Sequence, residues 1–257
     1  MGMAESWIVR DQFNKQATQF DNWTITQDEK THQFLMEFYN ISAADELLEF
    51  ACGTGAFAIY AAERARTVWG VDISEGMIEV ATTNARERQL ENIRFICSNA
   101  EKVSFESEQF SCVSSKAAYH HMKNYPAVFQ EMKRYCQNQG RICIQDIISY
   151  EDSKLDDFFE RLELLIDSCH HRTLSKQEIV DLYKQNNVEV FRALVSVSTL
   201  NFYEYVNHAV QTEEDKAEID ELVRMGLNDP LISQWLFTEN DTLFWKRKVL
   251  TIAGYKR

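Results

Sequence analysis

The chain has 257 residues, of which 45% are hydrophobic, so it can bury the core of one large domain or of one domain with an insertion. Its formal net charge of −13 disfavours nucleic acid or an anionic membrane as the main partner, because phosphate binding needs clustered Lys and Arg. The one tight basic run, Lys246-Arg247-Lys248, is predicted to be three exposed charges beside a strand.

The first 40 residues are predicted to form a helical cap. Residues 1–23 are polar with interspersed aromatics, so they are expected to pack as a helix over another element. Phe20 and Trp23 would there either close a ligand site or simply dock the helix on the surface of the domain. Residues 28–40 carry apolar side chains at the spacing of one helical face.

A strand, a glycine turn and a helix follow, and the rest of the chain is organised around them. Leu47, Leu48 and Phe50 supply the apolar run of a strand that is buried on both faces. Gly53 and Gly55 remove Cβ where the backbone turns and a ligand approaches. The N–H groups at the start of the next helix, from about residue 55 to 65, point over these glycines. This arrangement predicts a site for a nucleotide-like cofactor.

Strands and helices then alternate up to residue 150. Helices are predicted after Ser74, which can cap the first of them, and from about 125 to 137. The alternation predicts a parallel sheet wound on both faces, with residues 41–150 as the cofactor-binding core. Its further buried strands are expected at 67–72, 93–97, 110–115 and 140–146.

The pattern changes after residue 150. Long amphipathic helical stretches now predominate, and no convincing domain boundary separates them from the core, so residues 1–257 are predicted to be a single domain. The helical stretches at 151–187 and 205–240 are interpreted as substrate-lid additions. Strands are predicted at 188–201 and 243–253.

Six cysteines are scattered without a C-x-x-C pair, which indicates buried free thiols in a reducing compartment rather than a zinc site. We see neither a signal peptide nor a run of about 18 apolar residues, so we predict a cytoplasmic protein without a membrane span.

The identity of the cofactor depends on three polar positions at strand ends. Gly53, Gly55 and Ala58 also fit the dinucleotide fingerprint, which leaves an NAD-dependent oxidoreductase open. Glu49, however, lies inside the first strand, where a carboxylate suits an amine and repels a pyrophosphate. Asp72 ends the second strand, where it can bind ribose hydroxyls, and Asn99 follows the third, where it suits an adenine edge.

These residues resemble the class I S-adenosylmethionine-dependent methyltransferases, most closely the small-molecule branch that is similar to ubiquinone and menaquinone biosynthesis enzymes (methyltransferase domain of the 11/25 type). The resemblance covers most of the chain. It includes residues 13–17, the segment 115–122 with paired histidines, and 167–174, which resembles a lid segment. It implies a Rossmann-like, doubly wound α/β fold with a mostly parallel seven-stranded sheet, whose last strand is antiparallel, and S-adenosyl-L-methionine as cofactor.

The resemblance also implies roles for particular residues. Glu49, Gly53 and Gly55 would hold the methionine part, Asp72 the ribose, and Asn99 the adenine edge. Ala51 stands where the family usually has a glycine, and Asn99 where it usually has Asp. The full set of candidate cofactor-binding residues is Glu49, Ala51, Cys52, Gly53, Thr54, Gly55, Asp72, Ile73, Met77, Asn99, Ala100, Ser115 and Lys116.

A methyl acceptor that carries a proton at pH 7 needs a base near the carboxyl ends of the strands. The candidates are His120 and His121, which follow the fourth strand, and His170 in the lid segment. Asp146 ends the fifth strand near them, and its carboxylate is predicted either to make a structural hydrogen bond or to take part in catalysis. We expect no metal site, because adjacent histidines rarely face one point and no carboxylate has suitable spacing.

The sequence therefore predicts a methyltransferase that acts on a small-molecule acceptor. Two other functions remain open: an NAD-dependent oxidoreductase on a related fold, and a catalytically inactive nucleoside-binding protein. The departures from the family's usual residues at Ala51 and Asn99 support the second of these. The acceptor, the atom that is methylated and the oligomeric state do not follow from the sequence.

Overall fold

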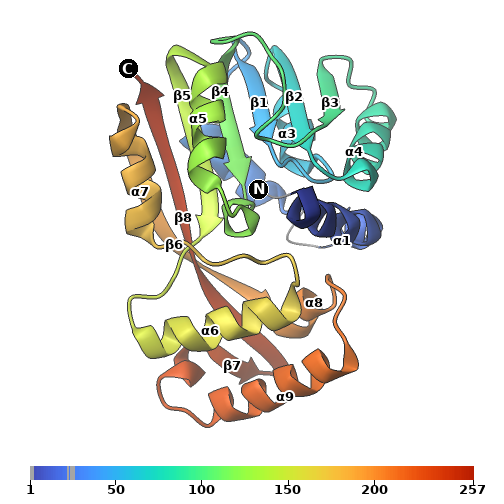
Figure 1. Ribbon diagram of the computed structural model, residues 1–257, viewed down its shortest axis with the longest axis vertical. Coiled ribbons are helices and arrows are strands. Elements are labelled where there is room, and N and C mark those ends of the chain that lie inside the picture. The colour runs from blue at the N-terminus through green and yellow to red at the C-terminus, as the bar shows by residue number, and fades with distance from the viewer. Residues whose placement is uncertain (1–2, 22, 24–26) are drawn as a thin grey trace.

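The computed structural model describes residues 3–21, 23 and 27–257, and for residues 3–8, 18 and 19 it describes the backbone alone. Figure 1 shows a twisted sheet with helices on both faces in the upper part and a smaller helical layer below it. Two long strands, β6 (Val188–Asn201) and β8 (Thr242–Lys256), connect the two parts.

Five parallel strands form the body of the sheet. They are β1 (Glu46–Phe50), β2 (Thr67–Asp72), β3 (Ile93–Cys97), β4 (Phe110–Lys116) and β5 (Cys136–Ile147). β8 pairs antiparallel with β5 and with β6, which gives the order β3-β2-β1-β4-β5-β8-β6. The predicted fold class, a doubly wound and mostly parallel sheet with an antiparallel last strand, is confirmed.

The sheet has an eighth strand in a segment that the sequence predicts to be helical. β7 (Leu236–Glu239) pairs antiparallel with the first residues of β8. Asn240 and Asp241 connect the two strands, and both have positive φ, 48° and 60°. Positive φ at both central residues is the requirement of a type I′ hairpin turn, which Asn and Asp tolerate. The helical prediction for 205–240 is therefore wrong at its end, because α9 (Glu213–Leu227) stops earlier.

Helices cover the two faces of the sheet unequally. On one face lie α2 (Glu29–Phe38), α3 (Ala56–Ala62) and α4 (Glu75–Glu87), and on the other lie α5 (Tyr125–Tyr135) and α7 (Lys176–Gln185). Side chains of β1 alternate between the two cores: Leu47 packs on the α2–α3 side, and Leu48 and Phe50 on the α5–α7 side. α1 (Met3–Asp21) lies against α4.

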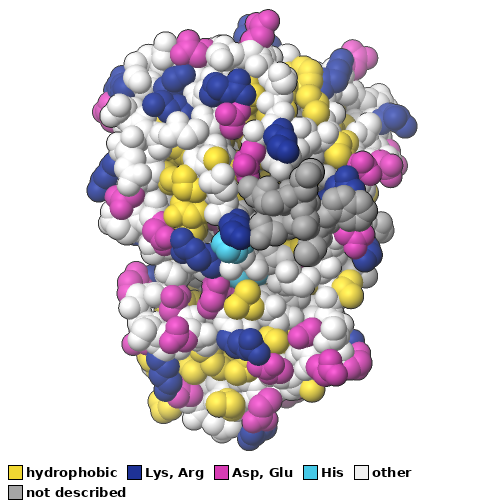
Figure 2. Space-filling model, viewed as in Figure 1, with side chains coloured by type: hydrophobic (Ala, Val, Ile, Leu, Met, Phe, Trp, Pro, Cys, Tyr) yellow, Lys and Arg dark blue, Asp and Glu magenta, His cyan; other side chains and the backbone are white. Residues whose placement is uncertain are grey.

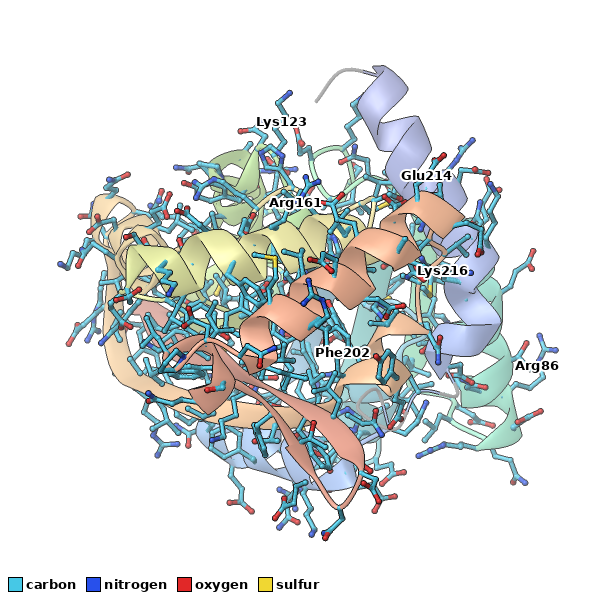
Figure 3. The ribbon with its side chains drawn as sticks, turned by 90° about the horizontal axis from the view of Figure 1, so that it is seen from below. Arg86, Lys123, Arg161, Phe202, Glu214 and Lys216 are labelled. Carbon is cyan, nitrogen blue, oxygen red and sulfur yellow. The ribbon has the colours of Figure 1, made fainter. Side chains whose placement is uncertain are left out.

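The lower part has a core of its own. α6 (Ser153–Ile166), α8 (Phe202–Val206), α9 and β7 surround Trp245 of β8, which is stacked on Phe159 with ring centroids 5.2 Å apart. Figure 3 shows α9 lying across α6, and Arg161 of α6 pairs with Glu218 of α9 at 2.5 Å.

Two predictions about single residues need correction. Arg247 lies inside β8 and is only 8% exposed, so the basic run is not three exposed charges beside a strand. All six cysteines lie in the described part of the chain and are free thiols, but Cys97 is exposed. Among the described residues, no helix has both the length and the apolar character that crossing a membrane requires.

Candidate active site

One cavity of about 490 Å³ lies at the carboxyl ends of β1, β2, β4 and β5, where open α/β sheets bind ligands. α1, β6 and β8 contribute further walls. We name its two ends by their residues. The glycine-turn end is formed by Glu49, Gly53, Asp72, Asn99 and Lys116, and the histidine end by His120, His121, Asp167, His208 and Arg247.

The turn between β1 and α3 shapes the glycine-turn end. Ala51, Gly53 and Gly55 all have positive φ, 52°, 54° and 76°. A Cβ on Gly55 would lie 2.7 Å from the ring of Phe95, so this glycine is required by packing, whereas a Cβ on Gly53 would meet nothing within 4 Å. Ala51 adopts the left-handed conformation despite its Cβ, which costs about 1–2 kcal/mol for an L-residue.

Asp72 ties this turn to the end of β2. One carboxylate oxygen accepts a hydrogen bond from the N–H of Gly53 and the other from the N–H of Ser74, both at 2.9 Å. Burial raises the pKa of the Asp72 carboxyl above its ordinary value, although these N–H groups oppose the shift. Each oxygen retains a second lone pair, which is the acceptor that a ribose hydroxyl needs.

Glu49 has an unsatisfied carboxyl oxygen at this end. The residue is 2% exposed, and its Oε2 has no hydrogen-bond partner among the described residues. Burial raises the pKa of the carboxyl to about 8, even though the nearby Lys116 ammonium opposes the shift. Burial also lowers the pKa of Lys116. A buried carboxyl oxygen without a partner is costly, so this site lacks a donor that a ligand amine would supply.

Most of the predicted cofactor-binding residues lie together. Ala51, Cys52, Thr54, Ile73, Met77 and Ala100 also line the cavity. The side-chain oxygen of Asn99 accepts from the N–H of Glu101 at 2.8 Å, which leaves its amide N–H groups for a ligand. Gly55 and Ser115 do not line the cavity: Gly55 caps α3 behind the turn, and Ser115 is buried in β4.

At the histidine end, His120 and Asp146 form a buried dyad. The Nδ1 atom of His120 lies 2.6 Å from Oδ1 of Asp146, whose other oxygen accepts from the N–H groups of Ala118 and Tyr119 at 2.9 and 2.6 Å. Burial alone would lower the pKa of His120, but the Asp146 carboxylate outweighs it and holds the pKa above the ordinary value. Because an ionised carboxylate only accepts, Nδ1 carries a proton and Nε2 is the free base.

The other two candidate histidines differ in position. His121 lines the cavity, and its Nδ1 lies 3.1 Å from the carbonyl oxygen of Cys169. Burial lowers its pKa to about 3, so its ring is neutral. His170 does not line the cavity, and its Nε2 lies instead 3.1 Å from Oε1 of Glu160 on α6.

Several residues of the histidine end were not predicted. Arg247 pairs with Glu163 at 2.5 Å, and its guanidinium lies 4.6 Å from the ring centroid of Tyr205. The Trp23 ring is stacked on His208 with centroids 4.8 Å apart. These residues come from both ends of the chain, and only the fold brings them together. Phe20 and Trp23 of the N-terminal stretch both line the cavity. Within the described residues, no group of three or more His, Cys, Asp or Glu is placed to hold a metal ion.

Comparison with known proteins identifies the core. Residues 48–144 match the family described as "Methyltransferase domain". Residues 48–144 therefore form a methyltransferase domain. This match covers the glycine turn, Asp72, Asn99 and the His120 segment, and it sets the oxidoreductase reading aside.

Proteins named as methyltransferases resemble this chain over stretches longer than residues 48–144. An uncharacterized methyltransferase, YcgJ of Bacillus subtilis, is 26% identical over 68% of this chain and 70% of its own length. Demethylmenaquinone methyltransferase of Geobacillus is 28% identical over 45% of this chain, which is about half (51%) of that protein. The crystal structure of a putative methyltransferase from Bacillus halodurans has the same fold, with a TM-score of 0.81 and 20% identity over 88% of this chain and 99% of that one.

Proposed function

We propose that this methyltransferase binds its cofactor at the glycine-turn end and methylates a small molecule held at the histidine end, with His120 as the base. The observation that carries the proposal is the single cavity that joins the two ends. A cofactor at one end and an acceptor at the other would then meet inside one cavity, which favours transfer because the reactants are held close together and aligned.

The residues of the glycine-turn end fit S-adenosylmethionine. Glu49 offers the cofactor's amine a buried carboxyl oxygen that has no partner in the described part of the chain. Gly53 leaves open space where any other residue would place a Cβ. Asp72 keeps free lone pairs for the ribose, and Asn99 keeps amide N–H groups for the adenine. When bound, the cofactor supplies a methyl group on a sulfonium, which a nucleophile can attack in line.

His120 would prepare that nucleophile. With Nδ1–H held by Asp146, Nε2 is available to accept the acceptor's proton, and the resulting imidazolium is stabilised by the carboxylate at 2.6 Å. Asp146 is thus the positioning residue: it fixes the tautomer and orientation of His120. This arrangement serves an acceptor whose O–H, N–H or acidic C–H must lose a proton before it attacks.

The additions to the core would form the acceptor site. Phe13 and Phe20 come from the N-terminal cap, Asp167 from the 151–187 stretch, and Tyr205 and His208 from the 205–240 stretch, and all five line the cavity. We infer that these segments act as the lid that selects the acceptor. A macromolecular acceptor such as nucleic acid fits less well, because Figure 2 shows Lys and Arg scattered among Asp and Glu on this face rather than gathered.

Calorimetric titration with S-adenosylhomocysteine, the product form of the cofactor, tests this function. We expect the wild-type protein to bind it and NADH not to bind. Asp72→Ala should weaken binding by about 1.5–3 kcal/mol, through the loss of charged hydrogen bonds to the ribose. The exposed Asp220→Ala on α9 is the control and should bind as the wild type does. No binding by the folded wild-type protein, or equal binding by both variants, would refute the proposal.

A further inference from the structure

Three histidines of the histidine end are fixed in the same tautomer. Nδ1 of His120 faces the Asp146 carboxylate, Nδ1 of His121 lies 3.1 Å from the carbonyl of Cys169, and Nδ1 of His208 bonds to the carbonyl of Tyr205. Carbonyls and carboxylates only accept, so each Nδ1 carries the proton. In the neutral rings, each Nε2 is therefore a hydrogen-bond acceptor. Three acceptor nitrogens therefore belong to residues that line this end of the cavity.

One pair of these acceptors lies unusually close. Nε2 of His121 and Oδ2 of Asp167 are 4.0 Å apart, and both side chains are mostly buried, at 14% and 6% exposed. The other oxygen of Asp167 already accepts from the N–H of Cys169 at 2.8 Å. No donor from the described part of the chain bonds to either of the two facing atoms. His121 and Asp167 both line the cavity, so a donor group of a ligand can lie between the two facing atoms.

The electrostatics specify what kind of donor this is. The N–H of Cys169 donates to Oδ1 of Asp167, and a hydrogen bond to a carboxylate favours its anionic form. Since His121 is neutral, nothing at that pair compensates the charge. Arg247 does not do so either, because it is paired with Glu163, whose second oxygen accepts from the Tyr205 hydroxyl at 2.5 Å.

We propose that the acceptor carries a protonated amine that binds between Oδ2 of Asp167 and Nε2 of His121. An ammonium nitrogen can lie within about 2.9 Å of both atoms and donate a separate N–H to each. A hydroxyl has one hydrogen and would leave the other acceptor unpaired. Aromatic side chains add to the site: the Phe13 ring contacts His121 edge-on at 5.2 Å, and Trp23 and Tyr205 line the same cavity.

This inference rests on the proposed function and narrows it to amine-bearing acceptors. The proposed position of the amine between Asp167 and His121, which we call the amine seat, lies beside the base His120. The ring centroids of His121 and His120 are 4.0 Å apart. An acceptor anchored by its amine would thus present a neighbouring group to Nε2 of His120. A carboxylate or phosphate in the same position would face Asp167 and be rejected.

Three phenols of similar size test the seat: tyramine, neutral 4-ethylphenol and anionic 3-(4-hydroxyphenyl)propionate. Their affinities are measured by calorimetry on protein saturated with S-adenosylhomocysteine. We expect tyramine to bind at least about tenfold more tightly than either of the others, which corresponds to one buried charged contact. Weaker or equal binding of tyramine, or no binding of it, overturns the inference. Failure of S-adenosylhomocysteine itself to bind would instead refute the proposed function.

The variant Asp167→Asn tests whether the preference for tyramine arises at Asp167. The amide keeps an oxygen for the N–H of Cys169 and turns a donor toward His121, so the protein should fold and still bind S-adenosylhomocysteine, while the preference for tyramine falls to within about threefold. Asp220→Asn removes the same charge from the surface and should keep the full preference. If both variants behave alike, the preference comes from the protein's overall charge and the amine seat is wrong.

Discussion

The pH dependence of cofactor binding should report directly on Glu49. Its carboxyl is buried and has a pKa of about 8. At pH 7 roughly nine-tenths of the free protein would therefore hold this carboxyl protonated, and ionising it to meet an ammonium costs about 1.4 kcal/mol. Below the pKa, affinity should rise about tenfold for each pH unit and then level off above about pH 8, because binding releases the proton.

Titration calorimetry with S-adenosylhomocysteine between about pH 6 and 8.5 measures this slope. Repeating one pH in two buffers of different ionisation enthalpy counts the protons released, which should be close to one at pH 6. Glu49→Gln keeps the size of the side chain but cannot ionise, so its affinity should not change with pH. At about pH 8 it should bind more weakly than the wild type by about 1.5–3 kcal/mol.

Two results would contradict this reasoning. Wild-type affinity that stays constant from about pH 6 to 8 would show that Glu49 does not meet the cofactor's amine. A slope that survives in Glu49→Gln would assign the proton to another ionisable group at this end, either Asp72, whose pKa is raised by burial, or Lys116, whose pKa is lowered by burial. Asp220→Asn serves as the charge-matched control and should keep the wild-type slope.

Three further predictions concern the turn and the dyad. Ala51→Gly should raise the free energy of unfolding in urea by about 0.5–1 kcal/mol, because it relieves a left-handed Cβ at some entropic cost; a loss of stability would contradict this. Gly55→Ala should cost about 2–3 kcal/mol, since its Cβ would collide with a ring, whereas Gly53→Ala should cost only about 1–2 kcal/mol of backbone strain; equal losses would show that the collision is relieved. In NMR titrations the pKa of His120 should lie above 6.5 in the wild type and, because burial is then the largest remaining influence, below it in Asp146→Asn; an unchanged pKa would exclude the dyad.

The sequence predicted the sheet well because its strands are buried. β1 and β2 lie within one residue of their predicted ranges, since continuous apolar runs bounded by turn residues allow few alternatives. β7 was missed because a strand of only four residues that follows a long helix shows too little periodicity to be distinguished from it. The pair Asn240-Asp241 was the available signal, as a two-residue turn of this type favours a hairpin.

The two ends of the site differed in how far the sequence could predict them. The glycine-turn end is built by short segments that follow successive strands, so their order in the chain already places them at one edge. The histidine end joins Trp23, Asp167, His208 and Arg247, which are distant in sequence and meet only through the lower core. The basic run around Arg247 looked like a solvated surface, because its partner Glu163 lies on a different element.

A crystal structure of the protein with S-adenosylhomocysteine would test the central claim most directly. We predict that the ribose hydroxyls lie within hydrogen-bond distance of Asp72, the amine lies on Oε2 of Glu49, and the sulfur faces the space beside Nε2 of His120. A nucleoside bound in the opposite direction, with its adenine at the histidine end, or bound outside this cavity, would contradict it.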